Sequence, residues 1–395
     1  MAIFPLWWSS ASELFGRRPI YVVSNVCLTV FGVLSAVSPS ISVFLVMRFL
    51  TGGASSAAMS VGAGTISDIW EPKERGTAMS LFLLGPLCGP LIAPMIGGAL
   101  GQSLGWNTRC AVMAVLIVVA LPETSMRQPL GVTPSSHVSG GNEKESGNPS
   151  SNAPSFNRTF IQPLKLLAYL RLPPIALTVY AHSLSFSTIY FVNISLEYAF
   201  NEPPYSFPTW AIGLIFAPAS VGFLVGGLLG GPWTDHIMRR HALKKNRRNE
   251  NGDLIYLPED RMRENAWLGL LLLPTTLIWY GWAVQKELMW VAVLLPTMFM
   301  GFGSFMLMSM SLTMLTEFMP GRSASGVAIN NLCRYLVSFV ALLSTHAWVQ
   351  AIGKGWVMTI VGVWSSSLIV VVLLMYKRGP KWREEMNHNL RKTPI

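Results

Sequence analysis

The hydrophobic residues of this chain gather into ten long apolar segments separated by shorter polar ones. An α-helix needs about 20 predominantly apolar residues to cross a bilayer, and most of the segments reach that length. A further apolar run, Ala2–Trp8, is too short to cross. The pattern predicts an all-α membrane protein whose spans cover residues 19–38, 42–66, 77–103, 106–121, 172–199, 210–233, 265–284, 289–312, 323–348 and 356–376.

One long polar segment divides these spans into two groups. Pro122–Lys165 is rich in Ser, Gly, Asn and Pro, and such a composition cannot bury enough apolar surface to offset the entropy of ordering. We therefore expect an N-terminal helical bundle over residues 1–121, a disordered cytoplasmic linker over 122–165, a C-terminal bundle over 166–376 and a cytoplasmic tail over 377–395.

Composition and charge support the same class of protein. Only 12% of residues are charged, 51% are hydrophobic and the mean hydropathy is +0.44, whereas soluble domains average about 25% charged residues. With the spans above, most Lys and Arg residues fall on one side of the membrane, and Arg109, Lys286 and Lys354 fall on the other. The basic side is predicted to be cytoplasmic. The net charge of +10 thus reflects topology, and no nucleic-acid partner is expected.

A charged signature occurs twice, each time next to an apolar run. In both copies an acid is followed four and five residues later by arginines: Glu13 with Arg17 and Arg18, and Asp235 with Arg239 and Arg240. An internal repeat at corresponding membrane boundaries is typical of transporters built from two related halves.

The repeat predicts two crossed gates at the cytoplasmic surface. The segments 42–66 and 289–312 are each followed closely by an acid, Asp68 or Glu317. Helix N-termini favour a nearby acid because their amides are unpaired and carry partial positive charge. We expect four contacts, the alternative being solvated loop charges: Arg17 with Asp68, Arg239 with Glu317, Glu13 near Ser323–Ala324, and Asp235 near Gly76–Thr77.

The segment 77–103 repeats small residues and prolines. Small residues recur at every fourth position, which gives one smooth helix face for close packing. The prolines remove backbone donors and allow a bend; an ordinary packed helix is the alternative. The residues concerned are Gly85, Pro86, Gly89, Pro90, Ala93, Pro94, Gly97, Gly98 and Gly101.

Two arginines lie inside apolar segments, where a charge is costly. Arg48 lies about seven residues into its span, too deep for easy snorkelling, and so is expected to face a cavity or a partner. Arg334 lies deeper in its span, and we interpret it as the centre of a substrate cavity that includes Asn330, Asn331, Tyr190, Asn193 and His182. Polar contacts between helices are the alternative for each.

No set of residues suggests catalysis or metal binding. Ser, His and acidic residues are scattered, the four cysteines lie in apolar segments without metal-ligand spacing, and no GxxxxGK[ST] phosphate loop is present. The sequence therefore predicts neither an enzyme nor a transporter driven by its own ATP hydrolysis.

These motifs together resemble the major facilitator superfamily, and within it the fungal drug:proton antiporters with twelve spans. The family's first span and most of its second have no counterpart here, so the resemblance implies two pseudo-symmetric bundles that carry spans three to twelve. The matching segments are Glu13–Arg18, Arg48–Gly52, Gly85–Pro90 with Gly97–Gly98, Pro258–Arg261, and Gly321–Ser325 with Asn330–Asn331.

The resemblance implies a function. A member of this family would export a drug, toxin or fungal secondary metabolite in exchange for protons, with Arg48 in proton coupling and no cofactor other than the proton gradient. We expect a monomer in the lipid bilayer, in the plasma membrane rather than the vacuole. The alternatives are an organic-acid or polyamine transporter, uptake by symport, and an inactive fragment or non-transporting sensor.

Overall fold

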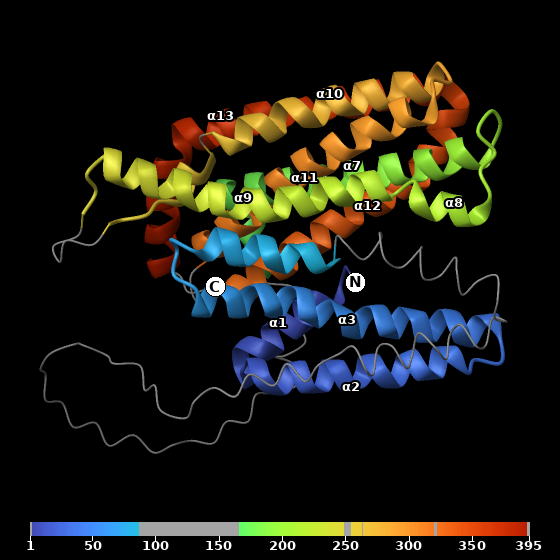
Figure 1. The fold of residues 1–395 in the computed structure, drawn as a ribbon. Coiled ribbons are helices and arrows are strands. Elements are labelled where there is room, and N and C mark those ends of the chain that lie inside the picture. Colours follow the sequence, from blue (N-terminus) through green and yellow to red (C-terminus); the bar gives the residue numbers. More distant parts are fainter. Residues whose placement is uncertain (1, 87–165, 249–253, 263, 320–321, 393–395) are drawn as a thin grey trace, which may run out of the picture.

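The computed structural model describes residues 2–86, 166–248, 254–262, 264–319 and 322–392, and they form helices packed side by side (Figure 1). In this described part, eight helices are long and apolar enough to cross a membrane. They correspond to eight of the predicted spans. Residues 75–86 are also helical, but the rest of segment 77–103, all of 106–121 and the linker 122–165 lie outside the described residues.

The N-terminal half contains α1 (Phe4–Phe15), α2 (Arg17–Ala36) and α3 (Ile41–Ile69), followed by the helical residues 75–86. Both α1 and α2 pack on α3. Gly16, with φ of 89°, ends α1 and allows α2 to begin at the next residue, because glycine adopts positive φ without a steric penalty.

The C-terminal half is built from pairs of long helices that pack side by side. In it α9 packs against α11, α10 against α13, and α12 against α7. Its elements are η1 (Leu166–Arg171), α7 (Pro173–Asn201), α8 (Thr209–Leu214), α9 (Ala217–Lys244), η2 (Pro258–Met262), α10 (Asn265–Gln285), α11 (Trp290–Phe318), α12 (Ser323–Ile352) and α13 (Lys354–Lys392).

Both copies of the charged signature lie in helices that extend beyond the predicted spans. In the first copy, Glu13 lies in the last turn of α1 and Arg17 begins α2, with Gly16 alone between the two helices. The second copy lies inside α9, which continues to Lys244, beyond the end of the predicted span 210–233. Charged residues end the apolar run but remain good helix formers, so the helices extend beyond the apolar segments. For the same reason, α13 continues through the expected tail to Lys392.

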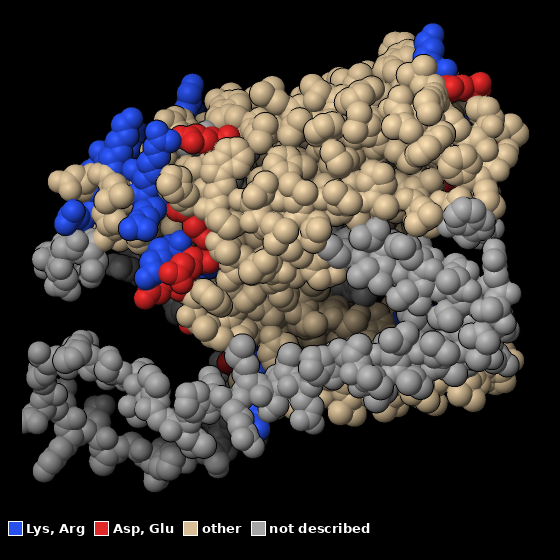
Figure 2. Space-filling view, in the orientation of Figure 1, with Lys and Arg blue, Asp and Glu red and all other residues tan. Residues whose placement is uncertain are grey.

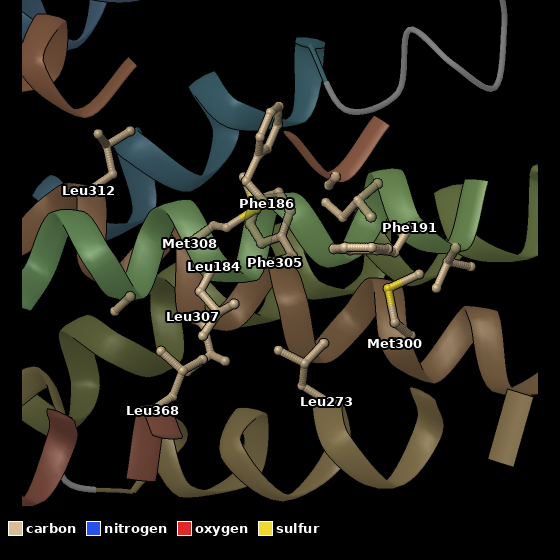
Figure 3. Packing of buried hydrophobic residues seen from close by; sticks show 14 of the residues in the cluster. Leu184, Phe186, Phe191, Leu273, Met300, Phe305, Leu307, Met308, Leu312 and Leu368 are labelled. Atoms are coloured by element: carbon tan, nitrogen blue, oxygen red, sulfur yellow. The ribbon is translucent and has the colours of Figure 1, made fainter. Parts of the chain in front are cut away.

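Among the described residues, most of the hydrophobic core lies around α7 and α11. Residues of the N-terminal half also belong to it, namely Leu6, Ala63, Met79 and Leu83. Phe186 of α7 and Phe305 and Met308 of α11 pack together, with Leu273 of α10 and Leu368 of α13 beneath them (Figure 3). In the most apolar window of α7, 78% of the residues are buried, against 17% for α2. The apolar side chains of α2 therefore form an outer surface suited to lipid.

Charged residues gather at one end of the bundle, which we call the basic end. Figure 2 shows Lys and Arg clustered where α9 ends, a region that includes Arg239, Arg240 and Lys244. Both copies of the charged signature lie at this end. The distribution matches the predicted division between a basic side and a side with few charges.

Two glycines allow α9 and α11 to approach closely. A Cβ added at Gly222 would lie 2.0 Å from the Met298 carbonyl oxygen, and one at Gly301 would lie 2.3 Å from the Ala219 carbonyl oxygen. Both neighbours are backbone atoms, which cannot rotate away as a side chain would. Any larger residue must therefore push the two helices apart.

We predict that Gly222→Ala lowers the thermal stability of the purified protein. Overpacking a tight contact costs about 1–3 kcal/mol, so the melting temperature from intrinsic fluorescence should fall by several degrees. Gly32→Ala is the matched control, because a Cβ at Gly32 would meet nothing within 4 Å. Equal melting temperatures for the two variants would contradict the close contact.

Candidate functional site

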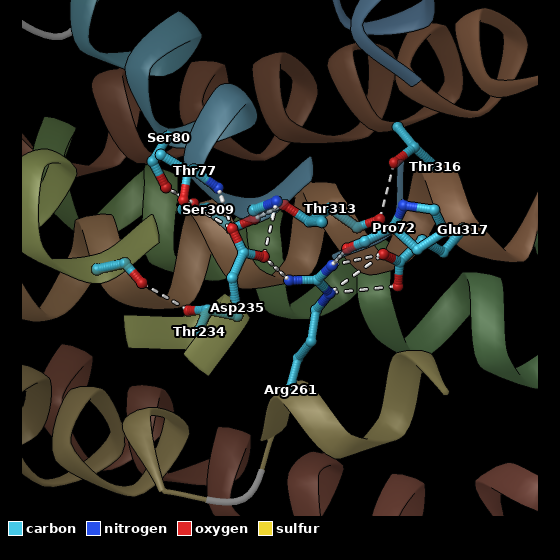
Figure 4. Close-up of polar contacts among 12 residues, drawn as sticks. Pro72, Thr77, Ser80, Thr234, Asp235, Arg261, Ser309, Thr313, Thr316 and Glu317 are labelled. Atoms are coloured by element: carbon cyan, nitrogen blue, oxygen red, sulfur yellow. Dashed lines mark hydrogen bonds and ion pairs between the residues drawn. The ribbon is translucent and has the colours of Figure 1, made fainter. Parts of the chain in front are cut away.

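The second copy of the signature connects the two halves of the protein through Asp235. Its carboxylate accepts hydrogen bonds from the amides of Gly76 (3.0 Å) and Thr77 (2.8 Å) and from Thr77 Oγ1 (2.7 Å) (Figure 4). Asp235 thus supplies partners to the first turn of helix 75–86, whose amides have none within the helix. A Cβ at Gly76 would lie 2.5 Å from Asp235 Oδ1, so this contact requires glycine. The structure places Asp235 where the sequence predicted it.

Arg261 of η2 lies at the centre of this region and is fully buried (Figure 4). Its Nη1 donates to Asp235 Oδ1 at 2.7 Å, and its Nη2 donates to Glu317 Oε1 at 2.7 Å and to the Pro72 carbonyl oxygen at 2.6 Å. Burial by itself would lower the pKa of Arg261, but the carboxylates of Glu317 and Asp235 outweigh it and raise the pKa. The guanidinium group therefore stays charged and ties α9, α11 and the N-terminal half together.

The expected pair between Arg239 and Glu317 was wrong. Arg239 is exposed, and Arg261 occupies the position beside Glu317. The two copies of the signature differ at one decisive residue, because Gly16 of the first corresponds to Met238 of the second. Gly16 turns the chain between the acid and the arginine, whereas α9 continues through Met238 and keeps Arg239 on its exposed side.

The first copy makes contacts of its own. Arg17 donates from Nε (3.2 Å) and Nη2 (2.9 Å) to Asp68 Oδ2, as expected. Glu13 accepts from the amide of Ser325 at 3.3 Å and from its Oγ at 2.6 Å, one residue beyond the expected Ser323–Ala324. Arg18 is exposed at the start of α2.

We call Glu13, Arg17, Asp68, Asp235, Arg261 and Glu317 the basic-end network. Neutral contacts accompany it across the two halves. Ser67 donates to Ser323, and the hydroxyl groups of Ser80 and Ser309 lie 2.6 Å apart. A Cβ at Gly64 would lie 2.9 Å from Cβ of Ala324. The two halves are therefore closed against each other at the basic end.

Burial decides which pairs in the network matter most. Arg17 and Asp68 keep side-chain exposures of 22% and 46%, and exposed pairs contribute only about 0–1 kcal/mol. Removing one partner from a buried ion pair costs about 3–5 kcal/mol, because the other charge is left without compensation. Among the members of the network, Arg261 therefore contributes most to the stability of the closed arrangement. Sequence reasoning missed its role, although the charged Pro258–Arg261 motif had been singled out.

A second group of polar residues lies on α7 and α12, and most of its members are buried. Arg334 of α12 is 3% exposed. Its guanidinium carbon lies 4.5 Å from the ring centroid of Phe186 and 4.7 Å from that of Tyr335. Its Nη2 donates to Tyr335 Oη at 3.2 Å. The Phe186 ring also contacts that of Tyr190, with centroids 5.2 Å apart.

Several buried polar atoms of this group have no hydrogen-bond partner among the described residues. They belong to both helices: Nε2 of His182, Oγ of Ser183, Nδ2 and Oδ1 of Asn330, Nδ2 of Asn331 and Nε of Arg334. Buried polar atoms are nearly always paired in folded proteins, so a concentration of unpaired ones marks a place where a ligand can bind. We call these five residues, with Phe186, Tyr190 and Tyr335, the central cluster.

The remaining predicted site residues lie outside the basic-end network and the central cluster. Asn193 is half-buried on α7. Arg48 is exposed on α3, with its guanidinium carbon 5.2 Å from the ring centroid of Phe44. Gly85 and Pro86 are exposed near the end of helix 75–86. The other residues of the proposed antiporter helix lie outside the described residues: Gly89, Pro90, Pro94, Gly97 and Gly98.

Comparison with known proteins agrees with this architecture. Residues 1–342 match the Major Facilitator Superfamily. The MFS transporter OpS2 of Beauveria bassiana is 38% identical over 340 residues, which cover 83% of this chain and 97% of that protein. The MFS antiporter QDR3 of Candida albicans is 30% identical over 97% of this chain and 71% of that protein.

The fold has a counterpart among solved structures. The proton:xylose symporter XylE, bound to 6-bromo-6-deoxy-D-glucose, aligns with a TM-score of 0.60 over 95% of this chain and 83% of XylE, at 16% identity. Fold and matches together define a multi-pass membrane transporter, not an enzyme. The chain belongs to the Major Facilitator Superfamily.

We predict that Arg261→Gln opens the basic end. A single reporter cysteine in place of Ser309, in a chain whose four native cysteines are replaced, should react with a membrane-impermeant maleimide at least about tenfold faster, since about 1.4 kcal/mol already corresponds to that factor. Arg239→Gln removes an exposed charge at the same end and should leave the rate unchanged. Equal rates in the two variants would show that Arg261 does not hold the halves together.

The exposed pair should behave differently. A double-mutant cycle with Arg17→Ala and Asp68→Ala, read by the same cysteine labelling, should give a coupling energy of about 0.2–1 kcal/mol. Strict additivity would mean that this pair does not influence closure.

Proposed function

We propose that this protein is a proton-coupled antiporter that exports a small organic compound, such as a drug, toxin or fungal secondary metabolite. The observation that carries the proposal is the central cluster, in which α7 and α12 carry unpaired buried polar atoms together with the buried guanidinium group of Arg334. Substrate would bind there, between the halves and near the membrane midplane, where transporters of this architecture bind theirs.

Alternating access also requires contacts that stabilise a state closed at one end of the protein. The basic-end network provides such contacts. The arrangement described here closes the basic end, and the positive-inside rule assigns that end to the cytoplasm. The central cluster is buried in this arrangement, so a substrate would reach it when the halves rock apart. Opening toward the cytoplasm would break the contacts of Asp235 and Glu13 to the opposite half, and such differential contacts set the populations of the two states.

Proton coupling is assigned to Arg48 by its place in the family motif. Its guanidinium group lies over the ring of Phe44 on the apolar helix α3, where a charge without a polar partner would be costly. A residue in that setting suits interaction with a group that changes its protonation during the cycle. The antiporter name of QDR3 and the Gly- and Pro-rich segment 77–103 favour exchange over symport.

The proposal needs neither a bound cofactor nor a partner subunit. The proton gradient supplies the energy, and we infer a monomer in the lipid of the fungal plasma membrane.

We predict that Arg48→Ala abolishes proton-driven export without reducing membrane insertion. Everted vesicles with an imposed pH gradient would be challenged with a panel of compounds toxic to yeast, and proton efflux would be followed with a pH-sensitive dye. Active compounds should release protons through the wild type, at an intermediate rate through Arg48→Lys, and not through Arg48→Ala. Lysine keeps the charge but not the planar fork of arginine.

The same experiment separates the proposal from its rivals. Unchanged proton release by Arg48→Ala would refute the coupling role. A wild type that releases no protons with any compound would favour a non-transporting membrane protein. Arg378→Ala, which removes an exposed charge on α13, is the matched control.

A further inference from the structure

We propose that the substrate is an amphipathic organic anion, in which a carboxylate or similarly delocalised negative group is attached to an aromatic or apolar body. The inference rests on the proposed transport function and specifies the chemistry of its central cluster. It selects among the compound classes that the sequence leaves open, and it disfavours polyamines and other cations.

The first argument is the unneutralised charge of Arg334. Within the described residues, no carboxylate forms an ion pair with Arg334, and its Nε has no partner. Phe186 and Tyr335 stabilise the cation through their ring faces, but aromatic rings do not neutralise a charge. A buried charge without a counter-ion is strongly unfavourable, so an anionic ligand would gain most by binding here.

The second argument comes from the distribution of acids in the sequence. The segment Ser323–Ile352, which forms α12, contains no Asp or Glu, and neither does the stretch 87–121. The single acid of α7, Glu197, is exposed, and Glu317 of α11 is already paired with Arg261. A cationic substrate would therefore find no negative partner at the depth of Arg334, and it would be repelled by the arginine.

The third argument is the mixture of amides and rings around the arginine. Asn330 lies one helical turn before Arg334, and residues four apart share a helix face. The amide Nδ2 atoms of Asn330 and Asn331 are unpaired donors, and they can complete the coordination of a carboxylate that Arg334 holds at its edge. Phe186 and Tyr190 then offer ring surface to an apolar body.

His182 adds a preference for a hydroxyl or amide N–H on the ligand. Its Nδ1 lies 3.1 Å from the carbonyl oxygen of Met308, and a carbonyl can only accept, so Nδ1 must donate. In the neutral ring, Nε2 is then an acceptor, and it has no partner among the described residues.

A matched series of probes tests the charge preference directly. 2-Naphthoate, 2-naphthylmethanol and 2-naphthylmethylammonium share one aromatic body and differ in charge. Binding to the purified full-length protein in nanodiscs, measured near neutral pH by microscale thermophoresis, should be about tenfold or more tighter for the anion than for the alcohol, equivalent to about 1.4 kcal/mol. The ammonium compound should bind more weakly than the alcohol. An ammonium compound that binds as tightly as the anion would overturn the proposal.

Two variants and one control test whether the anion preference arises at the central cluster. Arg334→Gln should bring the anion-to-alcohol affinity ratio close to one while the alcohol still binds, and Arg239→Gln should keep the wild-type ratio. Asn330→Asp is nearly isosteric and gives Arg334 a counter-charge, so it should fold even where Arg334→Gln does not. It should weaken 2-naphthoate binding about tenfold and strengthen binding of the ammonium compound. A wild-type preference in Asn330→Asp would refute the assignment to the central cluster.

Failure of this inference is distinguishable from failure of the proposed function. Preferential binding of 2-naphthoate without any proton-linked transport would retain the anion site and remove the antiport mechanism. Proton-linked transport of other compounds, with no preference for 2-naphthoate over the ammonium compound, would retain antiport and remove the anionic substrate class.

Discussion

The buried positive charge of Arg261 is the constraint on which the closed arrangement depends. A guanidinium group with no exposed surface must have its charge neutralised and its N–H groups paired, and here the partners come from three separate parts of the chain. Asp235 of α9 and Glu317 of α11 provide the carboxylates, and Pro72 of the N-terminal half provides a carbonyl oxygen. Because Asp235 also holds the first turn of helix 75–86, separation of the halves disturbs the whole set.

Arg334 is a second buried arginine, but no carboxylate pairs with it among the described residues. It is almost as deeply buried as Arg261, yet the partners that its guanidinium group has among the described residues are two aromatic rings and a tyrosine hydroxyl group. The first arrangement stabilises one conformation of the protein. The second leaves a buried charge without a carboxylate partner among the described residues, which is why we propose Arg334, and not Arg261, as the substrate-binding arginine.

The two halves repeat a sequence signature without repeating its geometry. A chain turn at Gly16 frees Arg17 to reach Asp68, while Met238 at the corresponding position lets α9 continue and leaves Arg239 exposed. Arg261, which is 26 residues from Asp235 in sequence, takes over the missing role. The charge balance of the gate is thus kept although the donor of the positive charge differs.

The sequence by itself determined the fold class, the positions of the eight spans that the structure describes, the basic side and the basic-end residues Glu13, Arg17, Asp68, Asp235 and Glu317, and it singled out Arg334 as a charge inside a span. These follow from local properties, which are apolar segment length, charge distribution and the cost of a charge inside an apolar run. Only the tertiary structure revealed Arg261 as the partner of Glu317, the helical course of both signatures and the concentration of unpaired atoms between α7 and α12. Those features depend on which side chains meet across helices far apart in sequence, and the spacing of residues along one chain does not contain that information.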